Sequence, residues 1–578
     1  MLKKENLKKI YYILKTNHIK SLLIILILTL ITSVLELIGV GLIVPLLGLF
    51  VKSEIPNYLN LFSWMESKNQ NQTLIIILIF FILIQLLKFM TSFLLLIKKS
   101  SFSWNLNATI AKKILSNYLK KDIIFFSKNH SSEMINKVNG ESNLFSFGVV
   151  GPLIEIVIET FLLVGISLFL FFYNFKITLF LIFFFLILVF FWNRYFNPYL
   201  GELGKKRKFH SEKTIEIIQA GIGSIREIIL YGIGNIFLKE YDVHNEATVN
   251  IGKKRDIIIS FPRLCLEFLS ILLIFSIFII LLNKEISLEE IIIVIGVFVF
   301  AIIKLIPSIN KIVRAIQGIK FNNVVIETIY NESINYNNYK SHEEVFSDNL
   351  EFDFSSIELK NFTFKYEGTE KNILHNVNFK ILKNDKIGII GKTGSGKTTL
   401  INIICGLIKS DNGQTLLNGK DMHLKNKSKI WQGSLSYVSP DTYIMNESIL
   451  FNVTFENDKL TNISKLNQVL EAAQLSQFIK EFPGGIHGKV GENGSKLSMG
   501  QKQRLGIARA LYKNPKILIL DEATSFLDEV TETKILQKLF EYNDEKTIIS
   551  ISHRKNSLTE FNKIFEIKDM NVTKINFN

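Results

Sequence analysis

Ten residues from Gly391 to Leu400 read G-K-T-G-S-G-K-T-T-L, a pattern that could hold a phosphate chain. Glycines let the backbone turn its N–H groups inward, and a following helix presents its positive N-terminal end to anions. Lys397 would reach the β- and γ-phosphates, and the Thr398 hydroxyl would bind Mg²⁺. The alternative is a glycine-rich turn before a helix, but every fixed position of a Walker A loop is filled: Gly391, Gly396, Lys397 and Thr398. The pattern therefore predicts a polyphosphate site.

Two carboxylates stand at the end of a second apolar run, Ile517 to Leu520. A buried strand there would place Asp521 beside the phosphate loop, where it would hold Mg²⁺. Glu522 would orient or deprotonate the attacking water. His553 follows another strand-like run and would hydrogen-bond the γ-phosphate. A histidine after a strand is usually a surface residue, but the two motifs upstream favour the catalytic interpretation.

Strands and helices must position these residues. Ile387 to Ile390 form a strand-like run that leads into the phosphate loop, and the segment Leu497 to Gln501, L-S-M-G-Q, opens a helix-like run. Ser498 is a natural N-cap, and the free amides at such a helix start favour a phosphate. From about residue 350 the short strands and helices predict an α/β P-loop domain over 350–578.

The first 315 residues are far more apolar. Six stretches could cross a bilayer, which needs about 20 apolar residues each. They are Ser21–Val51, Thr73–Ile97, Phe145–Tyr173, Ile177–Trp192, Ile257–Leu282 and Leu288–Ile306. They predict an α-helical six-span transmembrane domain over 21–315. An amphipathic segment with six lysines precedes it at 1–20, and a polar, Asn-rich linker follows it at 316–349.

The charges orient these spans. The formal net charge is +15, with eight Lys or Arg between Lys98 and Lys137 and eleven between Arg194 and Arg255. By the positive-inside rule both termini are cytoplasmic, and the anionic inner leaflet is a better partner for these charges than nucleic acid. The two cysteines, Cys265 and Cys405, suggest neither a disulfide nor a zinc site.

Ionisable residues inside the spans are costly in hydrocarbon, by several kcal/mol each, so they should face a bundle interior or a wet cavity. The clearest are Glu36, Lys88, Arg263, Glu267 and Lys304. Arg263 and Glu267 are four residues apart on one helix face and can pair, and Glu36 and Lys88 can pair between helices. Structural ion pairing is one interpretation. The other is a cationic cavity for an anionic substrate group, because cations outnumber anions.

The order of a phosphate loop, L-S-x-G-Q and a carboxylate-ended strand resembles the ATPase domain of ABC transporters. With six spans ahead of it, the whole chain resembles an ABC exporter half-transporter. The resemblance implies that ATP and Mg²⁺ bind, that Tyr366 stacks on adenine, and that two copies form a homodimer. It implies that Ser498, Gly500 and Gln501 contact ATP bound to the other copy. It implies that the phosphates are held by Gly391, Lys392, Thr393, Gly394, Ser395, Gly396, Lys397, Thr398 and Thr399.

One departure from the family concerns the segment Tyr437 to Asp441, Y-V-S-P-D, which usually contains a glutamine where this chain has Pro440. Proline offers no side-chain ligand to Mg²⁺ and stiffens the loop. Hydrolysis is still expected, because Glu522 and His553 remain.

Within the exporters, the membrane half resembles the PglK-type flippases of bacterial protein N-glycosylation, which move lipid-linked oligosaccharides in the inner membrane. This resemblance implies that Lys88, Arg263 and Lys304 meet the pyrophosphate of the substrate. Export of a peptide, bacteriocin, other lipid or drug is the alternative. A soluble ATPase acting on DNA is disfavoured by the six apolar stretches, and a nucleotide-gated channel by Glu522.

Overall fold

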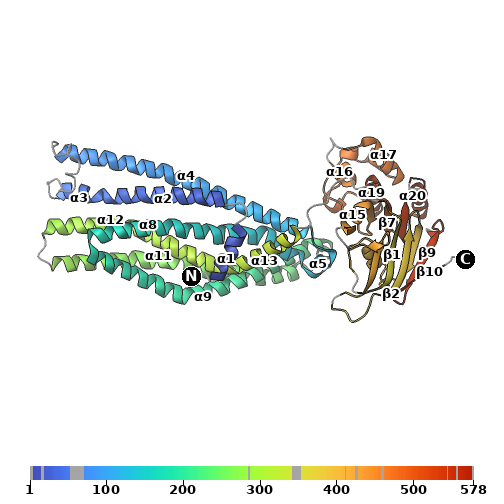
Figure 1. The fold of residues 1–578 in the computed structure, drawn as a ribbon, viewed down its shortest axis with the longest axis horizontal. Helices are drawn as coiled ribbons and strands as arrows, with labels where there is room; N and C mark the ends of the chain where they lie inside the picture. Colours follow the sequence, from blue (N-terminus) through green and yellow to red (C-terminus); the bar gives the residue numbers. More distant parts are fainter. Residues whose placement is uncertain are drawn as a thin grey trace. The chain divides into compact units, whose positions relative to one another are not determined.

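The computed structural model describes residues 4–14, 19–51, 70–283, 287–340, 353–366, 368–409, 412–423, 427–456, 461–542, 545–552, 554 and 558–575. His553, one of the predicted catalytic residues, lies outside these ranges. The chain divides into two compact units, one made of residues 1–121 and 125–340 and the other of residues 122–124 and 341–578 (Figure 1).

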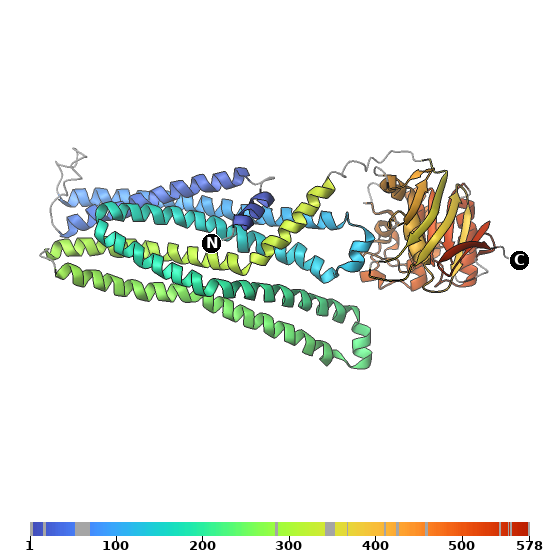
Figure 2. The same ribbon diagram turned by 60° about the horizontal axis from the view of Figure 1, so that its bottom comes forward.

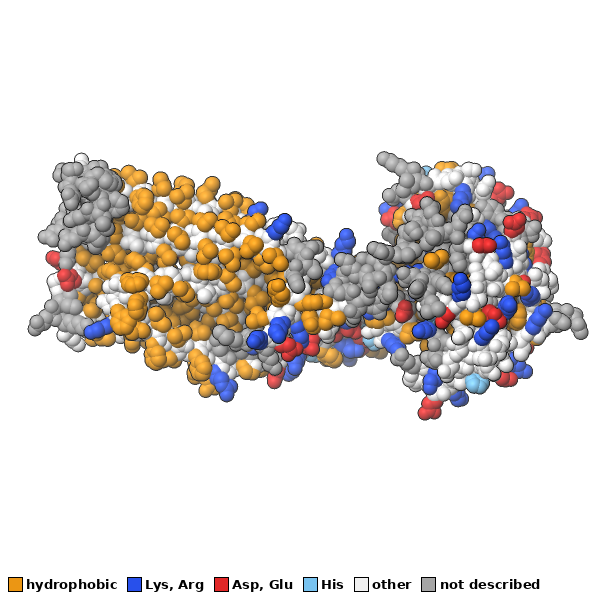
Figure 3. Space-filling view, in the orientation of Figure 1, with side chains coloured by type: hydrophobic (Ala, Val, Ile, Leu, Met, Phe, Trp, Pro, Cys, Tyr) orange, Lys and Arg blue, Asp and Glu red, His pale blue; other side chains and the backbone are white. Residues whose placement is uncertain are grey.

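The first unit is a bundle of long helices that lie side by side (Figures 1 and 2). Among the described residues, six helical segments are long and apolar enough to cross a membrane, which agrees with the predicted number. They contain α2 (Ile19–Gly41) with α3 (Ile43–Val51), α4 (Gln70–Tyr118), α8 (Gly151–Tyr173), α9 (Phe175–Gly223), α11 (Gly234–Leu282) and α12 (Leu288–Phe321). Figure 3 shows hydrophobic side chains covering much of the visible face of this unit, as lipid contact requires.

Three of these helices are much longer than a bilayer is thick. α4, α9 and α11 have 49 residues each. At 1.5 Å per residue such a helix is about 74 Å long, against a hydrocarbon core of about 30 Å. Each must therefore continue beyond the membrane, and the part that continues includes part of one of the basic stretches, 98–137 or 194–255. Prolines lie inside α9 (Pro198), α11 (Pro262) and α12 (Pro307).

Short elements join the long helices. α5 (Ile123–Lys128) follows α4, and α10 (Ile225–Tyr231) lies between α9 and α11. Both short helices lie within the two basic stretches, 98–137 and 194–255. α6 (Ser131–Ile135), η3 (Asn136–Glu141), α7 (Ser142–Phe145) and η4 (Ser146–Val150) then lead into α8, and both η segments are π-helical. Periodicity did not indicate these two widened turns.

The helical unit extends further than the sequence suggested. Residues 316–349 were expected to be a linker, but α12 runs to Phe321 and α13 covers Asn323–Lys340. Phe321, Val325, Ile326 and Ile329 are buried at helical spacing, so this Asn-rich segment has an apolar face that its composition conceals. The amphipathic segment at the start forms α1 (Lys4–Leu14), which packs on α13 and brings Tyr12 against Tyr330.

The second unit is built on two sheets. The antiparallel one has the order β2 (Leu374–Leu382), β1 (Ser356–Phe364), β4 (Asn412–Leu417) and β5 (Lys420–Asp421). The other has the order β10 (Asn571–Ile575), β9 (Lys563–Lys568), β3 (Lys386–Gly391), β8 (Thr547–Ile551), β7 (Ile517–Asp521) and β6 (Leu435–Val438), and all its pairs are parallel except β9 with β10. This α/β unit confirms the predicted fold class.

Helices complete the second unit and position its motifs. The longer ones are α14 (Lys397–Ile404), α15 (Lys427–Ser434), α17 (Ile463–Ala472), α19 (Met499–Tyr512) and α20 (Glu529–Tyr542), and α16 (Ile449–Thr454) and α18 (Ser476–Glu481) are short. β3, β8 and β7 run parallel, so their carboxyl ends meet at one edge of the sheet. Ligands of open α/β sheets bind at that edge. The phosphate loop after β3 and Asp521 at the end of β7 both lie there.

Candidate functional site

The phosphate loop, residues 391–396, has a backbone that only glycine can adopt at its two ends. A Cβ atom on Gly391 would lie 2.6 Å from Ser395 Oγ and 2.8 Å from the Ile567 carbonyl oxygen. Gly396 has φ 101°, and a Cβ there would lie 2.9 Å from Ile373 Cγ2. The backbone is therefore packed too tightly for side chains, as expected of a loop that presents its amides to a ligand.

Lys397 lies across its own loop. Its Nζ atom donates hydrogen bonds to the carbonyl oxygens of Gly391, at 2.9 Å, and Lys392, at 3.2 Å. Burial lowers the pKa of Lys397, while the charges of Glu522 and Asp521 act to raise it. The three predicted residues are therefore close in space. Ser395 Oγ is buried with no hydrogen-bond partner in the described part of the chain, so the loop retains an unused polar group for a phosphate.

The two carboxylates differ in their surroundings. Asp521 ends β7 and is only 2% exposed, and burial raises its pKa. A bound divalent cation would offset this cost, so the residue fits the predicted Mg²⁺ ligand. Glu522 has φ 49°, an uncommon backbone for a residue with a side chain, and its N–H donates to the Ile551 carbonyl oxygen at 3.2 Å. Such strain costs about 1–3 kcal/mol and clusters at functional sites.

Tyr437 is a site residue that the sequence did not single out. Its hydroxyl donates a 2.9 Å hydrogen bond to Asp521 Oδ2. This bond opposes the effect of burial on the Asp521 pKa. Tyr437 lies on β6, in the same segment as Pro440. Only the parallel pairing of β6 with β7 reveals the contact, because Tyr437 and Asp521 are far apart in the sequence.

Gln503 is a second residue that sequence reasoning missed. Its Nε2 atom donates to the Glu522 carbonyl oxygen at 3.2 Å and to Ser525 Oγ at 3.0 Å, and its Oε1 atom accepts from the Phe526 N–H at 3.1 Å. It is buried on α19 and fixes the backbone that carries Glu522. The sequence offered no local signal for this role, because Gln503 stands between two charged residues, a lysine and an arginine.

The L-S-M-G-Q segment caps α19 as predicted. Ser498 Oγ accepts from the Gln501 N–H at 3.3 Å, and Gln501 Oε1 accepts from the Ser498 N–H at 2.8 Å, which forms a capping box. Gly500 lies next to Phe526 and Leu527. Both Ser498 and Thr398 are exposed, as contact with a ligand requires.

Tyr366 lies beside the phosphate loop. Its hydroxyl is 3.3 Å from Thr399 Oγ1, and its ring meets Phe364 edge to face. The partly buried ring leaves a surface for a ligand, which is compatible with the expected adenine contact.

The five ionisable residues predicted inside the spans form two separate groups. Glu36 on α2 pairs with Lys88 on α4 and, at 3.2 Å, with Lys304 on α12. Arg263 pairs with Glu267 on the same helix, α11, at 2.8 Å. Both expected pairs are present, and the structure adds Lys304 to the first of them. Arg263 has its own partner.

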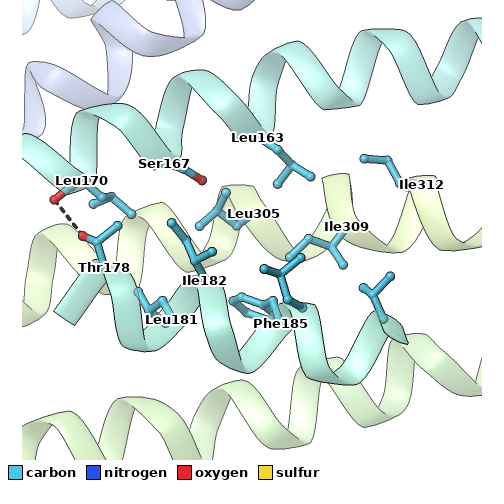
Figure 4. Close-up of a pocket in the computed structure, with 12 residues that line it drawn as sticks. Leu163, Ser167, Leu170, Thr178, Leu181, Ile182, Phe185, Leu305, Ile309 and Ile312 are labelled. Atoms are coloured by element: carbon cyan, nitrogen blue, oxygen red, sulfur yellow. Dashed lines mark hydrogen bonds between the residues drawn. The ribbon is translucent and has the colours of Figure 1, made fainter. Parts of the chain in front are cut away.

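An apolar cavity of about 240 Å³ lies among α8, α9 and α12 (Figure 4). Leu163, Leu181, Phe185 and Leu305 are among the residues that line it. Of its two hydroxyl side chains, that of Thr178 donates to the Leu170 carbonyl oxygen at 2.7 Å. Such a lining suits hydrocarbon rather than water.

Comparisons with known proteins agree with these features. The family described as ABC transporter transmembrane region matches residues 22–303, and the family described as ABC transporter matches residues 374–525. A Rickettsia bellii protein named as an export ATP-binding/permease protein is 28% identical over 483 residues, which cover 80% of this chain and 79% of that one. A Rickettsia typhi protein of similar name is 38% identical over 216 residues, 37% of each chain.

A solved bacterial Atm1-family ABC exporter with ATP bound has the same fold. Its TM-score is 0.76 at 18% identity, and the match covers 97% of this chain and 94% of that one. Some sequence matches are partial: the match to the Rickettsia typhi relative spans 37% of that protein's length. Both halves of the chain, in this order, nevertheless have their counterparts. The chain belongs to the ABC transporters, as an exporter with a multi-pass transmembrane region followed by an ATPase domain that binds ATP.

Proposed function

We propose that this exporter uses ATP hydrolysis to flip an amphipathic lipid with an anionic head group across the bacterial inner membrane, with its ATPase domain and both termini in the cytoplasm. The preferred cargo is a lipid-linked oligosaccharide joined through pyrophosphate. The observation that carries this proposal is the group formed by Glu36, Lys88 and Lys304, which places two ammonium groups against one carboxylate inside the membrane helices.

The group formed by Glu36, Lys88 and Lys304 has a net positive charge, which a bound anion would balance. A single positive charge left over in hydrocarbon costs several kcal/mol, and such residues usually mark a substrate path. A pyrophosphate brings at least two negative charges and several acceptor oxygens, which suit charge-assisted hydrogen bonds from lysine. The cavity among α8, α9 and α12 supports the apolar part of the cargo, since Leu305, which lines it, follows Lys304 on α12.

The ATPase unit supplies the driving force. Gly391 to Thr399 would hold the phosphates, and Glu522 would position and deprotonate the attacking water. Thr398 and Asp521 would hold Mg²⁺, which neutralises charge on the phosphates when it is bound. Ser498, Gly500 and Gln501 would contact ATP on a second copy, so we infer a homodimer. The role of His553, a hydrogen bond to the γ-phosphate, stays a prediction. Closure around ATP can drive transport only because the closed state binds ATP more tightly.

Reconstitution in liposomes tests the proposal. Neutralising Lys88, Arg263 and Lys304 to glutamine should abolish translocation of lipid-linked oligosaccharide and leave basal ATP hydrolysis intact. Lys176→Gln, at an exposed lysine in the first turn of α9, is the matched control and should transport normally. Translocation that persists in the triple variant would contradict the anionic-cargo proposal.

A second candidate cargo is a polypeptide or drug. A Bacillus subtilis protein named as a multidrug export protein is 33% identical over 219 residues, and the Escherichia coli alpha-hemolysin translocation protein HlyB is 38% identical over 211 residues. These matches cover 38% and 36% of this chain, so they leave most of it unmatched. Stimulation of ATP hydrolysis by drugs or peptides, with no response to lipid-linked sugars, would favour this candidate.

Tyr437→Phe should weaken the use of Mg²⁺. The variant loses the hydroxyl that donates to Asp521, and a hydrogen bond to a charged group contributes about 1.5–3 kcal/mol. We expect the Mg²⁺ concentration for half-maximal ATP hydrolysis to rise about tenfold. The Asp521 pKa also rises when this donor is lost, so its carboxylate form is lost at a higher pH and the acid limb of the rate profile moves upward. Tyr443→Phe, at an exposed tyrosine, should change neither property.

Pro440→Gln should preserve or raise ATP hydrolysis. The substitution restores a side-chain oxygen that can reach Mg²⁺ and loosens the loop that follows β6. Steady-state phosphate release from the purified, full-length protein measures the effect. A clear loss of activity would contradict the assignment of this segment.

A further inference from the structure

We propose that Glu36 is a displaceable counter-ion, which holds Lys88 and Lys304 until the anionic head group of the cargo takes its place. This inference rests on the proposed function and assigns a role to a residue that the proposed substrate contacts do not include. The ligand class is a lipid whose head group carries phosphate.

Glu36 is more deeply buried than the two lysines with which it pairs. Its Oε2 atom pairs with Lys88 and its Oε1 atom with Lys304, so each carboxylate oxygen holds one ammonium group. The Glu36 side chain is 8% exposed, whereas those of Lys88 and Lys304 are 23% and 32% exposed. The carboxylate lies behind the two lysines, and the lysines remain open to a ligand.

A second ion pair in the same helices provides a contrast. Glu159 on α8 pairs with Lys311 on α12 at 2.6 Å, and the Glu159 side chain is 4% exposed. Here one carboxylate meets one ammonium group, so the pair is neutral. The group around Glu36 has one positive charge in excess. It can therefore accept a further anion, which the Glu159 pair has no charge to attract.

Because of these charges, Glu36 and the head group of the cargo compete for the two lysines. A phosphate group carries more negative charge than a carboxylate and more acceptor oxygens, so it can take both lysines from Glu36. The displaced carboxylate is then buried without a cationic partner, a state that is costly. Return of Glu36 to the lysines helps to expel the head group. One residue would thus limit the affinity for the cargo and speed its release.

The test compares Glu36→Gln with Glu159→Gln in the full-length protein in nanodiscs. The binding probes are polyprenyl diphosphate, polyprenyl monophosphate and uncharged polyprenol. Glu36→Gln should bind the diphosphate at least tenfold more tightly, the monophosphate by a smaller factor and the polyprenol no better. In liposomes its KM and kcat for flipping should fall together. Glu159→Gln should leave the preference for charge unchanged. Glu36→Asp retains the charge and should restore release.

A purely structural role gives different results. Glu36→Gln would then lower the thermal stability while the diphosphate bound equally or less tightly, which would overturn the proposal. If the glutamine variant does not assemble, Glu36→Ala, which also removes the counter-ion, takes its place: it should tighten diphosphate binding relative to Glu36→Asp, and equal binding by the two variants overturns the proposal.

The proposed function can fail separately. Suppose that Glu36→Gln binds the diphosphate more tightly but the protein flips no oligosaccharide lipid. This result supports the counter-ion role of Glu36 and refutes the proposed cargo. Normal flipping by the wild type, with unchanged binding and KM in Glu36→Gln, refutes the counter-ion alone.

Discussion

Glu522→Gln will lower the rate of ATP hydrolysis by about 100- to 10,000-fold, the usual contribution of a positioned acid–base group. The amide cannot accept the proton of the attacking water. The backbone around Glu522 is fixed on both sides, by the hydrogen bond to Ile551 and by Gln503. The backbone should therefore keep its position in the variant, so that the loss of activity reports the missing proton acceptor.

Nucleotide binding should survive this substitution, because the phosphate loop and Lys397 are unchanged. Phosphate release measures hydrolysis, and retention of labelled ATP by the purified protein measures binding. Glu541→Gln, at an exposed glutamate near the end of α20, is the control. Hydrolysis above a tenth of the wild-type rate would mean that another residue is the general base, and His553 would be the next candidate. A variant that retains no ATP would revive the channel hypothesis.

Arg207→Met will destabilise the helical unit by about 3–5 kcal/mol, the cost of leaving a buried carboxylate without its partner. Glu141 on η3 has a side chain that is 0% exposed, and it pairs with Arg207 on α9 at 3.2 Å. Glu141 Oε2 has no hydrogen-bond partner in the described part of the chain, so the carboxylate has little other support.

The double variant Glu141→Met, Arg207→Met is the matched control. Replacing both members of a buried ion pair by apolar residues is often neutral or stabilising. Thermal unfolding of the protein in nanodiscs should show a large loss for the single variant and a small change for the double variant. Equal losses in both would mean that packing of Arg207 against Phe321, rather than charge, stabilises this region.

Local patterns were enough to predict most of the fold. Apolar runs of spanning length indicated the six helices, and the strand before Gly391 indicated where the phosphate loop begins. The α12–α13 region was misjudged because its many asparagines conceal buried positions such as Val325 and Ile329. The π-helical segments could not be predicted, because a widened turn depends on packing and has no composition of its own.

The candidate site, too, was predicted where local patterns identify a residue and missed where packing decides its contacts. Motif residues such as Lys397 and Asp521 are identified by their spacing along the chain. Tyr437 and Gln503 act through contacts between elements, which depend on which strands pair and how α19 packs. The Glu36–Lys88 pair was predictable because both charges need a partner in hydrocarbon. Lys304 joins that group through a contact between α12 and α2, for which its local sequence gives no signal.

Three prolines inside long helices of the bundle lie at similar distances from a helix end. Pro198, Pro262 and Pro307 each lie about 20 residues, or roughly 30 Å, from the ends of their helices at Phe175, Leu282 and Leu288. That distance is about one hydrocarbon thickness, so a bilayer that begins at these helix ends would end near all three prolines. Each proline removes one backbone hydrogen bond, which softens a helix locally. Weak points at a similar depth in three helices would let the segments beyond them bend together while the apolar segments keep their packing.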